Sequence, residues 1–151
     1  MANPTHLEKL KAQSTEDWNR WRLENPGVDP DLFKADLRGR DLSGTDLHAA
    51  NLEGAQLDGV NLSRSILVSA NLSKASLAKA KLENASAYFS DAHRANFESA
   101  NLSRSDFCQA NLTGANLKNA DLTGAAMLHT NLTEAALENA KTDGTSFAES
   151  S

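Results

Sequence analysis

Hydrophobic positions recur every five residues over most of the chain. The strings ADLRG, RDLSG, TDLHA and ANLEG follow one another from Ala35 to Gly54, and ANLSR, ANLTG, ANLKN and ADLTG keep the same register later. A period of five is neither the helical period of 3.6 nor the strand period of two. It therefore indicates an internal repeat, in which each unit of five contributes one large and one small inward-facing side chain.

We call the central residue of each unit the hub. The 23 hubs from Leu37 to Phe147 comprise 16 Leu, and the position two residues earlier holds 15 Ala. Asp or Asn directly precedes the hub in 14 units, and seven of the eight glycines follow two residues after a hub. The residue types at each position of the unit predict that the hub and the Ala face inward, that the polar residue between them faces outward, and that a turn follows the hub. Gly at the second turn position fits a type II turn, which requires a positive φ there. The hubs that are not Leu are Phe97, Phe107, Phe147, Met127, Ala87, Ala92 and Thr142.

This pattern closely resembles the pentapeptide-repeat family, with motif A(D/N)LXX, over residues 35–149. The resemblance implies an all-β solenoid, a right-handed quadrilateral β-helix in which four units of five form one coil. The 23 units would then give about six coils, and a strand spacing of about 4.8 Å makes the tower roughly 28 Å tall. We accordingly expect an N-terminal helical cap and linker at residues 1–34 and the solenoid at residues 35–151.

The residues before the repeats predict a short α-helical cap. Apolar residues lie at helical spacing and favour a helix over about residues 5–24, broken near Ser14 and ended by Asn25-Pro26-Gly27. Thr5 and Glu8 can form a capping box. A solenoid needs such a cap over its open end, and the alternative is a docking helix for another protein. The string WNRWRLENP is similar to segments of cyanobacterial members of the family. The residues that would form the cap are Leu7, Leu10, Trp18 and Trp21.

Composition narrows the choice of class. The 24 Ala and 21 Leu against 3 Val and 1 Ile favour helix by propensity, but the five-residue period overrides that preference. No apolar run approaches the roughly 20 residues of a membrane-spanning helix, and none resembles a secretory signal, so we expect a cytoplasmic protein. The family resemblance implies a bacterial one. A net charge of −5 argues against direct nucleic-acid binding, and balanced charges on the N-terminal helix argue against membrane binding.

The repeat geometry separates the residues that could form a metal site or a catalytic site. His48 and Cys108 share an outward column but lie three coils apart, roughly 14 Å at the strand spacing, whereas zinc ligands lie about 2 Å from the metal. The lone Cys108 forms no internal disulfide and has no base placed beside it. The sequence therefore predicts no catalytic residues, no metal site and no cofactor, and a protein that is not an enzyme.

One of the four sides is nearly free of charge. The side with hubs Leu47, Leu67 and Ala87 carries only Asp46, Asp106 and Glu149 as charged residues. A contiguous apolar stripe is a candidate contact surface. Alternatively, the small hubs Ala87 and Ala92 leave space in the core. Tyr88 or Phe89 turns inward to fill it, or Phe97 and Phe107 of the next coil do so. A third alternative is that the stripe has no role. The residues of the candidate surface are Ile66, Val68, Tyr88, Phe89, Cys108 and Leu128.

These features favour a non-enzymatic scaffold or protein-interaction module with an unidentified protein partner. A homodimer through a solenoid end or through the apolar side is one form of that function. The alternative is a DNA mimic that modulates DNA gyrase or another DNA-binding protein, because some family members act in this way. A 28 Å duplex carries about 16 charges, whereas residues 35–151 hold 14 acidic and 10 basic residues, a net charge of −4. The charge therefore disfavours mimicry.

Overall fold

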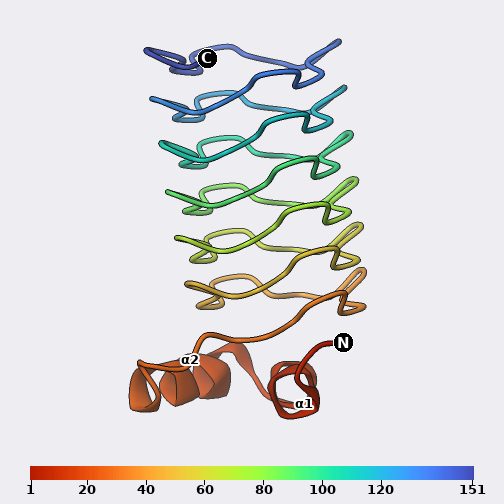
Figure 1. The fold of residues 1–151 in the computed structure, drawn as a ribbon, viewed down its shortest axis with the longest axis vertical. Helices are drawn as coiled ribbons and strands as arrows, with labels where there is room; N and C mark the ends of the chain where they lie inside the picture. The colour runs from red at the N-terminus through yellow and green to blue at the C-terminus, as the bar shows by residue number, and fades with distance from the viewer.

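The computed structural model describes residues 1–151, which form a tower of stacked coils closed at one end by two helices (Figure 1). Helix α1 spans Pro4–Ala12 and helix α2 spans Thr15–Glu24. Both helices lie below the first coil, and the chain then climbs coil by coil to the C-terminus at the opposite end. The predicted break near Ser14 and the predicted end before Pro26 are confirmed.

The coils are held in register by parallel pairing of residues 20 positions apart. The first pair is Asp31 with Asn51, the last is Ala126 with Ser146, and one residue in each unit of five takes part. Because four units separate the paired positions, each coil has four sides, and the β-pairing on each side is one residue wide. The first unit begins at Pro30, one unit of five before the predicted boundary at Ala35. Pro30 replaces the small residue of that unit, so its sequence lacks the repeat signature.

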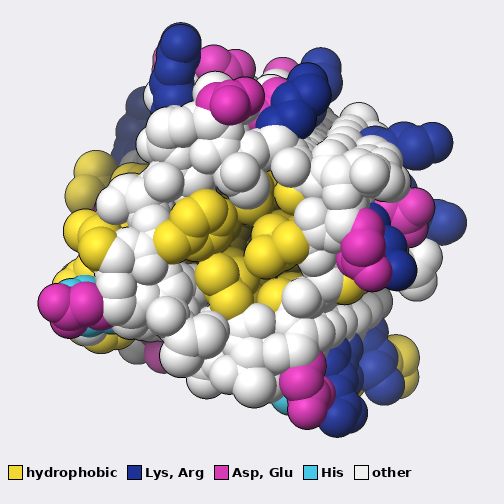
Figure 2. Space-filling model, turned by 90° about the horizontal axis from the view of Figure 1, so that it is seen from above, with side chains coloured by type: hydrophobic (Ala, Val, Ile, Leu, Met, Phe, Trp, Pro, Cys, Tyr) yellow, Lys and Arg dark blue, Asp and Glu magenta, His cyan; other side chains and the backbone are white.

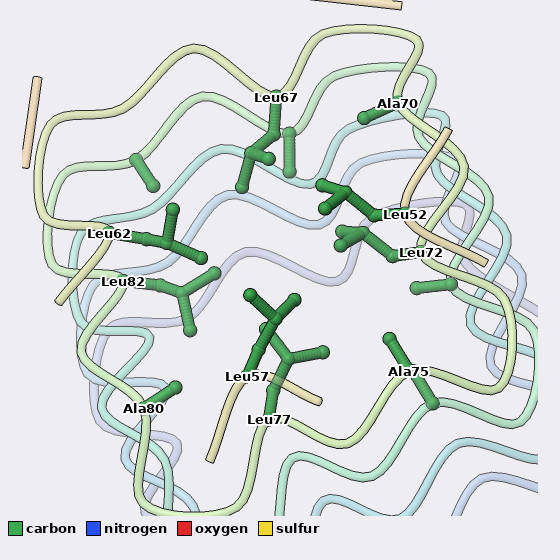
Figure 3. Packing of buried hydrophobic residues seen from close by; sticks show 14 of the residues in the cluster. Leu52, Leu57, Leu62, Leu67, Ala70, Leu72, Ala75, Leu77, Ala80 and Leu82 are labelled. Carbon is green, nitrogen blue, oxygen red and sulfur yellow. The ribbon is translucent and has the colours of Figure 1, made fainter. Parts of the chain in front are cut away.

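The interior is a set of leucine columns. Figure 3 shows Leu57 and Leu77 in one column and Leu62 and Leu82 in another, all pointing toward the axis of the coil, with alanines at the corners. The hubs from Leu32 to Met127 and the alanines that precede them belong to one cluster of 36 buried side chains. Each buried leucine contributes up to about 1.5–3 kcal/mol, an upper bound because the unfolded chain already buries some surface. The predicted inward direction of hub and Ala is confirmed.

Every corner of the tower is a tight turn with a left-handed residue. The N–H of Ala55 donates to the carbonyl of Leu52 at 3.0 Å, and Gly54 between them has a φ of +64°. This geometry confirms the type II turn predicted from the glycines. The same backbone conformation occurs at 17 corner residues other than glycine, which the sequence did not predict. Each costs roughly 1–2 kcal/mol relative to glycine, so packing of the hubs and bonding between coils must hold these turns in place.

The Asp or Asn before a hub closes the turn that follows it. Its Oδ1 accepts the backbone N–H of the residue two positions later, as Asn71 does from Ser73 at 2.9 Å. All fifteen Asp and Asn residues at this position make that bond. Their abundance therefore reflects the bonds that these side chains make to the backbone of the turns.

The two small hubs are compensated from within the core. Phe97 and Phe107 are fully buried, and their rings meet edge to face with 5.9 Å between centroids. Phe107 lies directly above Ala87 in its hub column, one coil further along the chain. The two phenylalanines thus fill the space that the sequence left open. The expectation that Tyr88 or Phe89 turns inward is wrong, because Phe89 is exposed and Tyr88 is half-buried at the surface.

The C-terminal end of the tower shows the core in cross-section. In Figure 2, hydrophobic side chains fill the centre of this end, and backbone and polar atoms surround them. Leu132, Leu137 and Phe147 are partly exposed there, and the hub Thr142 is exposed. The backbone N–H groups of Leu137, Thr142 and Phe147 have no hydrogen-bond partner, whereas the corresponding groups one coil below donate upward. The two ends of the tower therefore differ: helices cover the N-terminal end, whereas the C-terminal end leaves core side chains and backbone N–H groups uncovered.

Candidate interaction surfaces

Helix α2 lies along the open edge of the first coil and bonds to its backbone. The four side chains that point toward the coil are spaced at positions i, i+3, i+4 and i+7, which share one helix face. Each of them donates to a carbonyl of residues 43–48 that would otherwise face the end of the tower. The bonds run from Thr15 Oγ1 to Ser43 (3.3 Å), Trp18 Nε1 to Asp46 (2.7 Å), Asn19 Nδ2 to Gly44 (2.9 Å) and an Arg22 guanidinium nitrogen to His48 (2.9 Å).

The helix starts differ from the predicted capping box. Asn3 is the N-cap of α1, and its side-chain oxygen accepts from the backbone N–H groups of Thr5 and His6. Thr5 lies inside the helix, so the predicted pairing of Thr5 with Glu8 is wrong. Ser14 caps α2 by accepting the N–H of Asp17 at 3.1 Å, which explains why the helix divides there.

The four predicted cap residues pack against the solenoid core. Leu10 and Trp18 are buried, and Leu7 and Trp21 are partly buried against the same cluster. The Trp18 and Trp21 rings lie 5.1 Å apart. Only 1% of Trp18 is exposed, so this side chain has no surface left for the docking role considered as the alternative. The exposed apolar residue of α2 is Leu23, which the helical spacing did not single out.

We define the apolar side as the side that carries hub Leu47 and the hub of every fourth unit after it, up to Phe147. Three of its large side chains are exposed: Ile66 at 43%, Phe89 at 52% and Leu128 at 37%. Val68, Tyr88 and Cys108 are half-buried on the same side. All six predicted surface residues therefore lie on one side of the tower. The Tyr88 and Phe89 rings pack edge to face at 4.2 Å, and Tyr88 Oη accepts from Gln109 Nε2 at 3.0 Å.

Charged pairs between coils are concentrated on the other three sides. The apolar side has one such pair, Arg22 with Asp46 at its base, and near the top His129 Nδ1 lies 3.1 Å from Glu149, a contact that is an ion pair only when the histidine is protonated. Its third acid, Asp106, accepts the N–H of Cys108 at 2.9 Å. In the end-on view of Figure 2, Lys and Arg side chains project from the remaining edges. The pairs on the other sides are Lys74–Glu53, Arg104–Glu83, Lys118–Glu138 and Lys141–Asp121.

The side chains that could ligate a metal or act as a nucleophile are scattered over the rest of the molecule. No group of three His, Cys, Asp or Glu side chains converges on a metal position. Burial raises the pKa of the Cys108 thiol, which disfavours the nucleophilic thiolate. A hollow of about 300 Å³ beside Ser63 and Arg64 has no hydrophobic residue in its lining, unlike the mostly apolar pockets that bind small molecules. Neither helix has the length and apolar character needed to cross a membrane.

A stack of coils, each built from four turns of five residues, defines a β-helix solenoid. The chain belongs to the pentapeptide-repeat family: the family "Pentapeptide repeats" matches residues 31–67, 55–104 and 93–127, with 8 copies. No curated protein matches the chain.

Solved structures of other repeat proteins resemble the tower. The pentapeptide repeat protein Rfr23 from the cyanobacterium Cyanothece 51142 is 25% identical, covers 87% of this chain and 95% of its own, and gives a TM-score of 0.53. QnrB1 (R167E, trypsin treated), a plasmid-mediated fluoroquinolone resistance protein, is 22% identical. The match covers 74% of this chain and 67% of QnrB1, with a TM-score of 0.47. A pentapeptide repeat protein from the Arabidopsis thaliana thylakoid lumen is 34% identical. The match covers 73% of this chain and 66% of that protein, with a TM-score of 0.35.

Proposed function

We propose that the protein is a non-enzymatic scaffold whose apolar side docks a protein. The observation that carries this proposal is the exposure of Ile66, Phe89 and Leu128 on one side, where salt-bridge contacts occur only at the two extremes. Contiguous exposed apolar surface of this kind marks contact sites on proteins in water. The other sides carry the coil-to-coil ion pairs that are typical of surfaces left in solvent.

The proposed surface is rigid before any partner arrives. Coil-to-coil hydrogen bonds such as Leu67 N–H to Ser86 O at 2.6 Å and Ile66 N–H to Thr45 O at 3.0 Å fix the backbone beneath it. A preorganised surface loses little conformational entropy on binding. Tyr88 and Phe89 hold each other through their ring contact, so the two largest side chains of the side are also restrained.

We infer further that the tower is a right-handed quadrilateral β-helix of about six coils. Support comes from the pairing of residues 20 positions apart along residues 31–146 and from the family to which the chain belongs. This geometry gives the apolar side its flat shape, because each coil adds one short segment in the same plane. A flat rectangular side suits a partner that is itself flat.

Site-specific photo-crosslinking tests the proposed function. A benzoylphenylalanine replaces Phe89, and a matched control carries it at Ser99, a corner with the same positive φ on the opposite side of the tower. Irradiation of cells that express each form is followed by mass analysis of the adducts. We expect protein adducts from position 89 and few from position 99. Equal yields at both positions, or no adduct at position 89, would contradict the proposal.

A further inference from the structure

We propose that the C-terminal end of the tower binds the same end of a second copy of this chain. The twofold axis is perpendicular to the long axis of the tower and passes at Lys141, through the side that carries hub Thr142. The surface involved is not the apolar side, so the dimer stands without the docking function proposed above. The backbone groups that the last coil leaves unpaired, and the order in which they occur, carry this inference.

The upper edge of the last coil, at residues 132–151, has both donors and acceptors without partners. The N–H of each hub is free, and so is the carbonyl two residues before it. One coil lower, Leu117 N–H donates to Ala136 O at 2.8 Å, and Ala115 O accepts from Ala136 N–H at 2.9 Å. The unpaired hub donors are Leu137, Thr142 and Phe147, and the unpaired acceptors are the carbonyls of Ala135, Ala140 and Thr145.

Two such edges are complementary when they run antiparallel. A free N–H and a free carbonyl on either side of one residue match the same two groups of an antiparallel strand, which closes two hydrogen bonds. A twofold axis perpendicular to the tower makes the facing strands antiparallel on every side. Under the proposed axis, Thr142 N–H donates to Ala140 O of the second copy. On the two adjacent sides, Leu137 donates to Thr145 and Phe147 donates to Ala135, and each bond occurs twice.

The slope of the coil determines where the axis lies. Four sides climb one strand spacing of about 4.8 Å, so each side stands about 1.2 Å above the one before it. Ser151 N–H donates to Thr130 O at 3.2 Å, so Ser151 lies above residue 131 and the open edge runs from there to Ser151. Its midpoint is Lys141. Two identical ramps keep a constant separation only about this midpoint, because an axis one side away would drive each chain end into the last coil of the other copy.

Large side chains face small ones across this axis. Phe147 lies opposite Ala135 of the second copy, and Leu137 lies opposite Thr145. Leu137 and Phe147 are partly exposed on the single chain, and Figure 2 shows hydrophobic side chains at the centre of this end. Their contact across the axis removes apolar surface from water on both copies.

The charge at the axis is compensated by acids. The two Lys141 side chains face each other, but each is paired with Asp121 of its own chain at 3.5 Å. Asp143 of the second copy lies diagonally opposite Lys141, at a distance that a long side chain can span. Like charges therefore do not prevent the two ends from meeting.

A second coil end is the partner that matches this edge. The edge turns through all four sides, and its pairing is one residue wide on each side. A straight strand of another protein would follow only one of them. The N-terminal end of another copy is covered, since α1 and α2 lie below the first coil and Trp18 occupies the Asp46 carbonyl. Pairing of two C-terminal ends thus gives a closed dimer and not a fibre.

The size of the end sets the strength of the association. Five residues of about 3.3 Å limit each side to about 16 Å, so two ends in contact bury roughly 500 Å² within their backbones. Stable complexes bury at least about 1,200 Å². We therefore expect a weak dimer, with a dissociation constant of about 0.1 mM.

The dimer places the two apolar sides on opposite faces of one longer tower. The axis exchanges the side of hub Leu137 with the side of hub Phe147, and these two sides are opposite each other. The apolar side of the second copy therefore continues the Leu137 side of the first. This consequence alone rests on the proposed docking function: the dimer would hold two partners that face away from each other.

Sedimentation equilibrium of the purified protein at up to about 1 mM tests self-association. Thr142→Glu puts a charge at the centre of the edge, where association would remove it from water, and should raise the dissociation constant at least about tenfold. The Thr142 side chain is exposed on the single chain, so the variant should keep the thermal unfolding midpoint of the parent. Thr142→Leu restores the usual hub and should tighten association. Gln56→Glu, the same charge change at an exposed position of a lower coil, is the control.

Cysteine variants in a Cys108→Ser background locate the axis. Lys141→Cys alone should form a covalent dimer on mild oxidation, because this residue faces its own counterpart. Opposed residues that are not directly hydrogen-bonded have Cα atoms about 4.5 Å apart, within the 4.4–6.8 Å of a disulfide. Ala136→Cys alone should form none, whereas Ala136→Cys/Ser146→Cys should, since these positions lie on opposite sides of one chain and meet only across the axis. Gln56→Cys is the control for random collision.

The outcomes separate this inference from the docking function. A protein that stays monomeric at about 1 mM and forms no covalent dimer of Lys141→Cys overturns the inference. A dimer that is insensitive to Thr142→Glu, or one in which Ala136→Cys crosslinks alone, also overturns it, because association then uses another surface or another axis. Loss of protein adducts at position 89 with the dimer intact would instead refute only the docking function.

Discussion

Trp18 donates its indole N–H to the carbonyl oxygen of Asp46 at 2.7 Å. The neighbouring side chain, Asn19, accepts the backbone N–H of the same Asp46 at 2.8 Å. Helix α2 therefore occupies both backbone groups that Asp46 presents to the end of the tower. Since the first coil has no coil below it, these side chains take the place that an earlier repeat would have filled.

We expect Trp18→Phe to destabilise the protein by about 1–3 kcal/mol, because it leaves the partly buried Asp46 carbonyl without a donor. Trp18→Ala should cost about 3–5 kcal/mol, because it also opens a cavity. Urea unfolding monitored by circular dichroism measures both. Trp21→Phe is the control, since the Trp21 ring nitrogen makes no hydrogen bond in the structure. An equal loss for Trp18→Phe and Trp21→Phe would show that the bond to Asp46 is unimportant.

The corners predict substitutions of opposite sign. Ser99 has a φ of +58°, so Ser99→Gly should stabilise the protein by about 1 kcal/mol. Gly59→Ala, in the same corner column with open space around it, should destabilise it by a similar amount. Gly54→Ala should cost more, because the added Cβ lies 3.2 Å from Lys34 Cγ. Denaturant midpoints compare the three variants. A stabilising Gly59→Ala would refute this account of the turns.

Ala87 and Phe107 should be coupled in stability. Ala87→Leu overfills the space under the Phe107 ring and should cost about 1–3 kcal/mol. Combining it with Phe107→Leu restores a regular leucine column, so the double variant should lose at least about 1 kcal/mol less than the sum of the two single losses. Additive losses would mean that the Phe107 ring does not fill the space above Ala87.

Acid should weaken the first coil through Asp36. The hydrogen bond from the Arg38 guanidinium lowers the pKa of Asp36 to about 2. A carboxyl whose pKa is lower in the folded state stabilises the fold above its unfolded pKa of about 3.9, and that contribution disappears as the pH falls from about 4 to about 2. Bonds from Ser43 and Thr123 lower the pKa of Asp41 and Asp121 in the same direction.

Arg38→Ala provides the matching experiment for Asp36. Carboxyl NMR titration should show the pKa of Asp36 rising toward its ordinary value, while that of Asp121 stays in place. The unfolding midpoint of the variant should fall less than that of the parent protein between pH 4 and pH 2, in the range set by these pKa values. An Asp36 pKa that does not move would show that Arg38 is not the cause.

A gyrase supercoiling assay should show no effect of the purified protein at micromolar concentration. Duplex DNA carries about one charge per 1.7 Å, or about 16 over 28 Å, whereas residues 35–151 have a net charge of −4. Glu53, Glu83, Asp121 and Glu138 are moreover paired with basic residues of adjacent coils. Inhibition or protection of gyrase at submicromolar concentration would contradict the proposed scaffold function.

The repeat could be predicted because its signal is written in every unit. Leu at the hub, Ala before it and Gly after the turn each report one constraint of the coil, and the period of five outweighs the helical propensity of Ala and Leu. The first unit, at residues 30–34, escaped because Pro30 stands where Ala is usual. Corner residues such as Phe89 adopt positive φ without any sequence mark, because cooperative packing of the coil imposes that conformation.

The sequence predicted which side of the tower carries the candidate surface residues, but not whether their side chains are exposed there. The four-unit register assigns Tyr88 and Phe89 to one side, yet the sequence leaves open whether they fill the space beside Ala87. That choice depends on the directions of the Phe97 and Phe107 rings. The role of Trp18 was visible as helical spacing, whereas its bond to Asp46 depends on how the helix lies across an edge that no local pattern encodes.

The four-unit register limits how such a chain can change length. Each unit of five advances the chain by a quarter turn, so inserting or deleting one unit rotates everything above it by one side. Removing residues 91–95 would preserve a buried hub in every unit but would move Leu128 around a corner from Ile66. The packing of the interior thus tolerates the insertion or deletion of any number of units, while the surface pattern is preserved only when units are added or removed in multiples of four. Selection on a docking side would therefore appear in the sequence as indels of whole coils.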